Sequence, residues 1–225
     1  MSNNSKLIGL MALAAMIFSV STAAGPFDKL TKSLPGMGSD EPAVSATSAL
    51  DQQAELMDQV SEALTNLSSS QALMAEALGL KEEAAIAQQN ADSLAEGGIT
   101  GSDDMDKKLA SSDSVNSAIE QKLDEGTELD EESKKIFAAS IPPYGLGSVG
   151  MVTSAKTASS TATSLTASSD PAILAKLGDL KTLINFGKAA PSIITGFKDT
   201  TSKIIKFAQA NDIDTSELEA DVADW

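Results

Sequence analysis

The stretch that decides the fold runs from residue 50 to residue 78, LDQQAELMDQVSEALTNLSSSQALMAEAL. Its apolar residues recur at intervals of three and four, which places them on one stripe of an α-helix. The stripe consists of Leu50, Met57, Val60, Leu64, Leu67, Met74 and Leu78, and Gln71 is its polar exception. Because another helix must cover a stripe of about four heptads, and Ile86 and Leu94 continue it, we predict a long helical hairpin from Val44 to Leu94.

The first residues have the proportions of a bacterial secretory signal peptide. Lys6 precedes an uncharged apolar run over residues 7–20, and Thr22 and Ala24 stand where small residues precede a cleavage site. The run is short for a membrane-spanning helix. We therefore predict that residues 1–24 are cleaved off near Ala24 and that the mature protein is periplasmic or secreted, with a retained membrane anchor as the alternative.

The remainder of the chain divides into a linker and one domain. Residues 25–42 are rich in glycine and proline and lack apolar periodicity, so we predict a flexible linker. Residues 43–225 suit a single domain with a sizeable core. No cysteine is present, so packing alone must stabilise this domain.

The composition excludes several classes of function. All sixteen basic residues are lysine, acids outnumber them by two to one, and histidine is absent. Nucleic acid is a poor partner for such a chain, because phosphate binding needs a positive field and usually arginine. Without histidine and cysteine the chain lacks the usual transition-metal ligands and nucleophile–base pairs. We therefore expect a protein that is not an enzyme, with no cofactor, no metal site and no small-molecule substrate.

Two further helices follow the predicted hairpin. The first begins with acids at 103, 104 and 106, where they favour the positive end of the helix dipole, and it ends at Gly126. Its inner face carries Met105, Leu109, Val115, Ile119 and Leu123. The second runs from about Glu128 to Ser140 and is predicted to stop at Pro142 and Pro143.

Residues 145–150, GLGSVG, match the GxGxxG pattern of a dinucleotide-binding turn. That turn works only when a buried strand leads into the first glycine, and the preceding prolines disfavour a strand. A turn between two helices fits better. We predict that Gly145, Gly147 and Gly150 form a hairpin turn and permit close packing.

Small residues dominate the stretch that follows, SAKTASSTATSLTASS at residues 154–169. Such a helix lets a neighbouring backbone come close, and we expect Ala155, Ser159, Thr163 and Ala167 to mark the close-packed face. Serine and threonine are mediocre helix formers. A partly disordered linker over residues 157–169 is therefore the alternative.

The C-terminal part begins with Asp170 and Pro171, a capping side chain followed by a proline suited to the first helical position. An apolar face extends from there to Ala208, and we predict that Pro191 breaks or bends the helix. A short last helix carries Leu218, Val222 and Trp225, with the tryptophan docked on the core. Because no window alternates apolar and polar residues, the predicted fold class is all-α, a helical bundle of five to seven helices.

Charge is unevenly distributed along the chain. Residues 25–141 contain 23 acids and eight lysines, whereas residues 171–210 contain six lysines and two aspartates. The lysines complement the acidic helices within the chain, or they mark a surface-seeking helix. In the second case the candidate contacts with a membrane or partner are Lys198, Lys203, Lys206 and Phe207.

The absence of catalytic residue types and the long apolar stripe favour a non-catalytic role. We predict an exported interaction, scaffold or chaperone-like protein, whose partner is another protein or a second copy of the chain. The alternative is a membrane-active protein, pore-forming or membrane-surface-binding, that uses the charge-poor residues 136–169 and the basic helices at 171–210.

Overall fold

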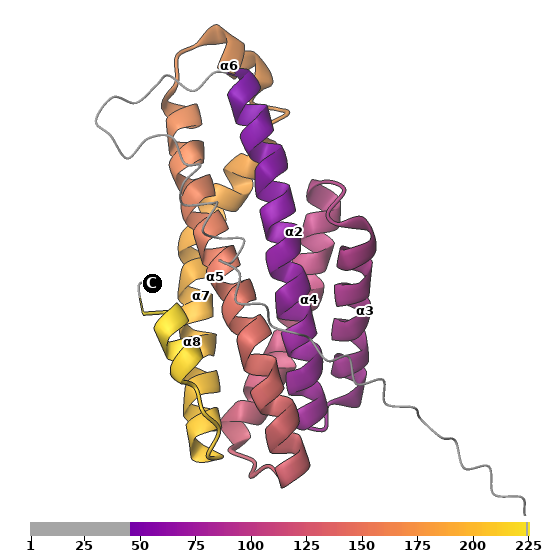
Figure 1. The fold of residues 1–225 in the computed structure, drawn as a ribbon. Helices are drawn as coiled ribbons and strands as arrows, with labels where there is room; N and C mark the ends of the chain where they lie inside the picture. Colours follow the sequence, from indigo (N-terminus) through magenta and orange to yellow (C-terminus); the bar gives the residue numbers. More distant parts are fainter. Residues whose placement is uncertain (1–45, 224) are drawn as a thin grey trace, which may run out of the picture. The chain divides into compact units, whose positions relative to one another are not determined.

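The computed structural model describes residues 46–223 and 225, and these form seven α-helices without any strand (Figure 1). The helices are α2 (Ala46–Ala77), α3 (Lys81–Gly97), α4 (Ser102–Glu125), α5 (Glu131–Ala167), α6 (Pro171–Lys176), α7 (Lys181–Ala210) and α8 (Ser216–Asp221). The prediction of an all-α bundle of five to seven helices is confirmed for this part of the chain. The predicted signal peptide and linker lie outside the described residues.

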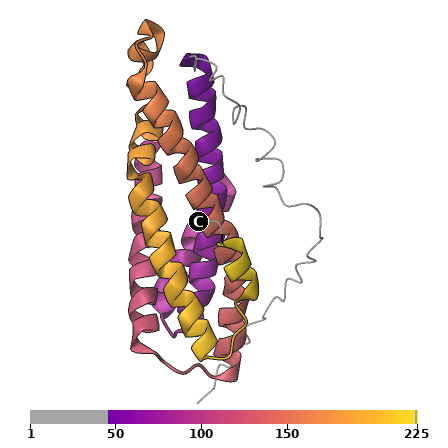
Figure 2. The same ribbon diagram turned by 90° about the vertical axis from the view of Figure 1, so that its left-hand side faces the viewer.

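Helix α5 lies between α2 and α7, and its contacts with these two helices are the most extensive in the bundle (Figures 1 and 2). Helices α3 and α4 pack on α2 as well as on each other. The apolar stripe of α2 explains this order, because Val60, Leu64, Leu67 and Met74 are buried by neighbouring helices of the same chain. The buried residues of the stripe are thus covered within one chain.

The chain turns between α2 and α3 at Gly79, which has a positive φ of 76°. This turn ends the apolar stripe, so the predicted continuation through Ile86 is wrong: 46% of Ile86 is exposed. Leu94, the other residue predicted to continue the stripe, is buried, and α3 packs on its neighbours through Ala87, Ala91 and Leu94. The chain reverses direction between α2 and α3. The spacing of apolar residues in α2 therefore does not determine which face of α3 packs on the core.

Helix α4 follows its prediction closely. Met105, Val115, Ile119 and Leu123 are buried and Leu109 packs against the core. Gly126 ends the helix with a φ of 67°, and its N–H donates to the Leu123 carbonyl at 3.1 Å. Only a residue without a side chain adopts this conformation at low cost, so glycine fixes the end of the helix.

Two expectations about residues 142–169 do not hold, because α5 continues through Pro142 and Pro143 to Ala167. A proline inside a helix frees the carbonyl four residues before it. Here those carbonyls belong to Ala138 and Ala139, which are both exposed, so water can satisfy them. The predicted stop at the prolines is therefore wrong. A disordered linker over 157–169 is also wrong, since the helix includes residues 157–167.

The three glycines of GLGSVG lie inside α5, so the predicted hairpin turn is wrong. All three are buried, and their role in close packing is clearest at Gly147. A methyl group on Gly147 would lie 2.8 Å from both the Ala63 carbonyl oxygen and the Leu67 nitrogen of α2. The glycine thus permits contact between two helix backbones.

A second close contact joins α5 and α7. A methyl group on Gly187 would overlap the Ala158 carbonyl and lie 2.8 Å from the Cβ of Ala162. The close-packed face of α5 is therefore the buried set Ala155, Ala158, Ala162 and Leu165. The predicted face was wrong beyond Ala155, because Thr163 and Ala167 are exposed. A spacing of four at every step drifts around a helix of 3.6 residues per turn.

The C-terminal helices begin as predicted but divide elsewhere. The Asp170 carboxylate accepts a hydrogen bond of 2.8 Å from the N–H of Ala172 and caps α6. The break falls at residues 177–180, and α7 runs through Pro191 without interruption. Pro191 is exposed while its neighbour Ala190 is buried. Packing of α7 on α5 thus holds the helix together despite the hydrogen bond that Pro191 cannot make.

Helix α8 packs on α5 through Leu218, which is buried, and Val222 contacts the same core. Trp225 is only half-buried, so its predicted docking on the core is at most partial. The described helices form one compact unit.

Candidate interaction groove

A groove of about 550 Å³ lies between α4 and α7. We call it the α4–α7 groove. Its walls extend from Ser102 to Glu120 on α4 and from Thr182 to Thr200 on α7, and α2 and α5 form its floor. Each wall is roughly 27 Å long at 1.5 Å per residue, or about five helical turns.

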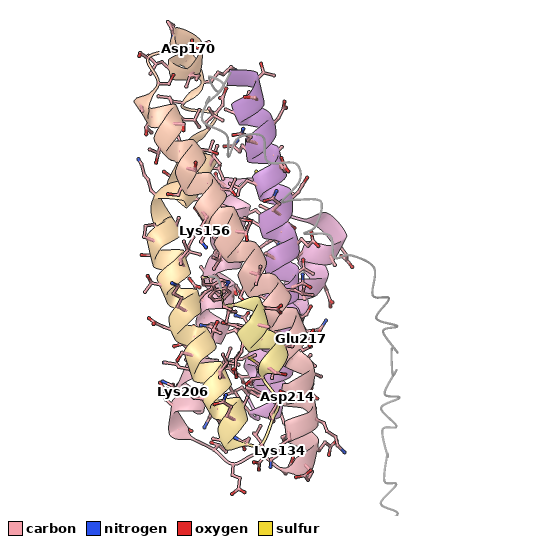
Figure 3. The ribbon with its side chains drawn as sticks, turned by 60° about the vertical axis from the view of Figure 1, so that its left-hand side comes forward. Lys134, Lys156, Asp170, Lys206, Asp214 and Glu217 are labelled. Carbon is pink, nitrogen blue, oxygen red and sulfur yellow. The ribbon has the colours of Figure 1, made fainter. Side chains whose placement is uncertain are left out.

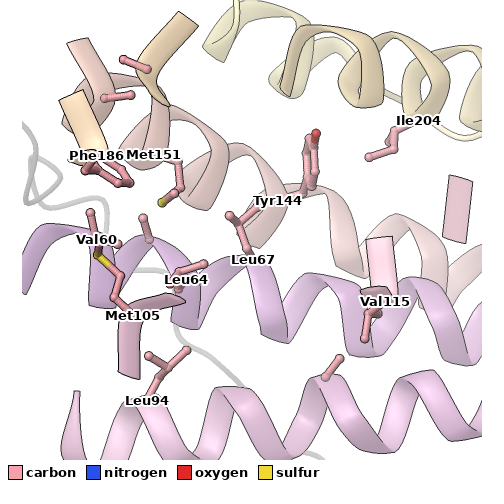
Figure 4. Close-up of a cluster of buried hydrophobic side chains, with 14 of the residues drawn as sticks. Val60, Leu64, Leu67, Leu94, Met105, Val115, Tyr144, Met151, Phe186 and Ile204 are labelled. Atoms are coloured by element: carbon pink, nitrogen blue, oxygen red, sulfur yellow. The ribbon is translucent and has the colours of Figure 1, made fainter. Parts of the chain in front are cut away.

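The floor of the groove is largely apolar. Figure 4 shows the side chains of Phe186 and Met151 directed toward α2, which carries Leu64 and Leu67. Further apolar lining residues are Met105, Leu109, Tyr144, Ile193 and Phe197. Phe197 and Ile193 are partly exposed rather than buried, so a ligand in the groove would remove apolar surface from water.

Gln71 is the polar exception in the apolar stripe of α2, and its partner is Ser112 of α4. The Gln71 amide donates to the Ser112 carbonyl oxygen at 3.1 Å, and the Ser112 hydroxyl donates to Oε1 of Gln71 at 3.1 Å. Both residues are buried. The two hydrogen bonds satisfy the polar groups of both side chains and fix the axial position of α4 relative to α2.

A set of polar residues, which we call the clasp, ties α4 to α7 at one end of the groove. It consists of Asn116, Glu120, Thr200 and Lys203. Oε1 of Glu120 accepts hydrogen bonds from Thr200 at 2.5 Å and from Asn116 at 2.8 Å, and Oε2 pairs with Nζ of Lys203 at 2.9 Å. Lys203 also pairs with Asp124 at 3.0 Å. Helices α4 and α7 therefore run in parallel, with residue 116 opposite residue 200.

The charge of Glu120 is stabilised by the clasp. Desolvation raises the pKa of this carboxyl group, but the hydrogen bonds from Thr200 and Lys203 and the charge of Lys203 outweigh that effect and lower the pKa. A carboxylate held in this way stays ionised and does not act as a proton donor near neutral pH.

Tyr144 lies at the floor of the groove and is fully buried. Its hydroxyl is 2.9 Å from Oγ1 of Thr201. Burial is the main cause that raises the pKa of this phenol, with a smaller contribution from the charge of Glu120. Tyr144 therefore stays neutral and serves as a packing and hydrogen-bonding residue.

The edges of the groove are acidic. Of the described residues that line it, four are acidic (Asp106, Asp113, Glu120 and Asp199) and none is basic. On α4 the acids recur every seven residues, and on α7 the polar residues Asn185, Ser192 and Asp199 do the same. This repeat is visible in the sequence, but it does not identify a groove, because the sequence does not tell which two helices are neighbours.

The predicted contact residues on α7 are only partly available. Phe207 is buried with its ring centroid 5.2 Å from that of Phe137, so its prediction as a surface contact is wrong. It lies on the face of α7 that packs on α5. Lys203 is engaged in the clasp, which matches charge complementarity within the chain. Lys198 is exposed, and so is Lys206 (Figure 3). Their role as contacts remains a prediction.

The charge-poor residues 136–169 proposed for membrane contact belong largely to α5, whose buried face packs on α2 and α7. Within the described part of the chain, no helix combines the length and apolarity required to cross a membrane.

Ser148, the serine of GLGSVG, is fully buried and donates to the Gly145 carbonyl oxygen at 3.1 Å, so it does not reach a substrate. Among residues 46–223 and 225, no group of three or more acidic side chains is placed to hold a metal ion. Comparisons of the chain with protein-family models, with curated proteins and with solved structures found no match.

Proposed function

We propose that the chain is a non-catalytic interaction protein that holds an α-helix of a partner protein in the α4–α7 groove. The observation that carries this proposal is the form of the groove, with two parallel helical walls of about five turns over an apolar floor. An amphipathic helix places apolar side chains at i, i+3, i+4 and i+7 into a groove of this kind.

The periodicity of the walls supports a helix over a small molecule. The acidic lining residues of α4 recur every seven positions (106, 113 and 120), and so do three of the polar lining residues of α7 (185, 192 and 199). Seven residues span roughly 10.5 Å, or two helical turns. A bound helix repeats its flanking side chains at the same interval, whereas a compact small molecule uses only a part of the groove.

The proposal includes export, as an interaction, scaffold or chaperone-like protein of the periplasm or cell exterior. This part rests on the N-terminal sequence, where Lys6, the apolar residues 7–20 and Ala24 have the proportions of a signal peptide. Mass spectrometry of the chain isolated from its native host tests it. Export predicts a mature N-terminus at Gly25, and a cytoplasmic protein that begins at Met1 or Ser2 contradicts it.

Site-specific photo-crosslinking in native cells tests the groove. A photoreactive residue at Ser192, which lines the groove, is compared with one at Ser160, an exposed position of α5 outside it. We expect an adduct from Ser192 that maps to one helical segment of one partner protein, and no such adduct from Ser160. Equal labelling from both positions contradicts the proposal. An adduct to a second copy of the chain would show that the groove serves self-association and not a separate partner protein.

Gly196 offers a matched pair of variants for the same experiment. It lines the groove, and a Cβ at this position meets no atom within 4 Å. Gly196→Trp places a bulky side chain in the groove and should abolish the adduct from Ser192. Gly196→Ala should retain it. An adduct that survives Gly196→Trp contradicts binding in the groove, provided that circular dichroism shows an intact helical fold.

A further inference from the structure

We infer that the helix held in the α4–α7 groove is cationic, with lysine or arginine on both sides of its apolar face. This inference rests on the proposed function and goes beyond it by naming the chemistry of the partner.

Three of the four acidic lining residues have no cationic partner within the described residues. Glu120 pairs with Lys203 in the clasp, whereas Asp106, Asp113 and Asp199 take part in none of the ion pairs among residues 46–223 and 225. All three are exposed at the groove. They are therefore free to pair with positive charges that a partner brings.

The position of these acids sets the pattern of charges on the partner. Asp106 and Asp113 are two turns apart on α4, and Asp199 lies on the opposite wall near the clasp. A bound helix meets the first two with cations seven residues apart on one flank, and the third with a cation on the other flank. Apolar side chains between the flanks reach the floor.

The two kinds of contact have different effects. Burial of the partly exposed apolar side chains of the walls, such as Ile193 and Phe197, supplies most of the affinity, while the rim charges select the partner and speed its association. An acidic helix would meet like charges at both rims and a chain with a formal net charge of −16. The groove therefore discriminates against acidic helices.

The test uses three labelled 18-residue peptides that share one leucine pattern and carry lysine, glutamine or glutamate at the flanking positions. Fluorescence anisotropy measures their binding to the mature chain, residues 25–225. At low salt we expect the lysine peptide to bind at least about tenfold more tightly than the glutamine peptide, and the glutamate peptide to bind most weakly. In 1 M salt, where the Debye length is about 3 Å, the lysine preference should largely vanish.

Two triple variants separate a groove effect from general attraction by an acidic protein. The groove variant is D106N/D113N/D199N. The control variant, D51N/D58N/E62Q, removes the same number of charges from exposed positions of α2 that do not line the groove. We expect the groove variant to lose most of the preference for the lysine peptide and the control variant to keep it. An equal loss in both variants overturns the inference.

Gly196→Trp distinguishes failure of this inference from failure of the proposed function. If the glutamine peptide binds as tightly as the lysine peptide and Gly196→Trp weakens both, the groove holds a helix but the cationic partner is wrong. If none of the three peptides binds, or if Gly196→Trp weakens none of them, both proposals are wrong.

Discussion

Nζ of Lys203 lies 2.9 Å from Oε2 of Glu120, and this ion pair joins α7 to α4 at one end of the groove. Oε1 of Glu120 accepts from Thr200 and Asn116 at the same place. Within the described residues, the hydrogen bonds and ion pairs between α4 and α7 all belong to this end. The clasp therefore holds the two walls together where the groove closes.

The clasp predicts a pH dependence of stability. Glu120→Gln should lower the free energy of unfolding at pH 7 by about 1 kcal/mol, the net value of the hydrogen bonds and ion pair of a partly exposed carboxylate. Folding lowers the pKa of Glu120 from its ordinary value of about 4.5. The contribution of the ionised carboxylate to stability is therefore fully present above about pH 4.5 and is lost as the pH falls through the folded pKa.

Urea denaturation of the two proteins between pH 7 and pH 3 measures this effect. The two unfolding free energies should differ at pH 7 and converge as the pH drops below about 4.5. A difference that stays constant over the whole range contradicts a role for the ionised carboxylate.

Gly147 should tolerate no side chain. Gly147→Ala places a methyl group 2.8 Å from backbone atoms of Ala63 and Leu67, which cannot move aside as a side chain can. We expect a loss of about 1–3 kcal/mol in the free energy of unfolding. Gly196→Ala is the control, because open space surrounds that position. It should leave stability unchanged or raise it by up to about 1 kcal/mol. Equal effects of the two substitutions would contradict the backbone contact between α2 and α5.

The pair of Gln71 and Ser112 predicts a non-additive double-mutant cycle. Gln71→Leu leaves the buried Ser112 hydroxyl without its acceptor and should cost about 1–3 kcal/mol of unfolding free energy. Ser112→Ala added to this variant removes the unsatisfied group and should restore part of the loss. Thermal or urea denaturation of the four proteins measures the coupling energy. Strict additivity would show that the two side chains do not depend on each other.

Asn211 should hold the connection between α4 and α5 in place. Its Oδ1 accepts a hydrogen bond of 2.8 Å from the N–H of Leu129, and its amide donates to the Phe207 carbonyl oxygen at 3.0 Å. Asn211→Ala leaves a buried N–H unsatisfied and should cost about 1–3 kcal/mol. Ser202→Ala, at an exposed position of α7, the helix that Asn211 follows, should change stability by less than about 0.5 kcal/mol. Similar losses in both variants contradict this role.

Helix type and number could be predicted from the sequence, because periodic apolar residues reflect local geometry. The prediction was most accurate for α4, where acids mark the start, Gly126 marks the end and the inner face is regular. It was least accurate where prolines were taken as stops and the glycines of GLGSVG were taken as a turn. Pro142, Pro143 and Pro191 all lie inside helices, because contacts with neighbouring helices compensate for hydrogen bonds that proline removes.

The groove could not be predicted, because it depends on which helices become neighbours. The seven-residue repeat of Asp106, Asp113 and Glu120 resembles any solvated helix face until α7 is placed opposite it. The burial of Phe207 could not be predicted either, because it too depends on which helices are neighbours. The lysines of its segment suggested a surface-seeking helix, but the packing of α7 on α5 buries the Phe207 side chain in the core.

Nuclear magnetic resonance of the isotopically labelled chain, titrated with the lysine peptide, tests most directly our proposal that the α4–α7 groove holds a helix. If the proposal holds, backbone amide shifts change along residues 102–120 and 182–200, the two walls of the groove, and Gly196→Trp suppresses these changes. Shift changes centred on α3 or spread evenly over the acidic surface would contradict it.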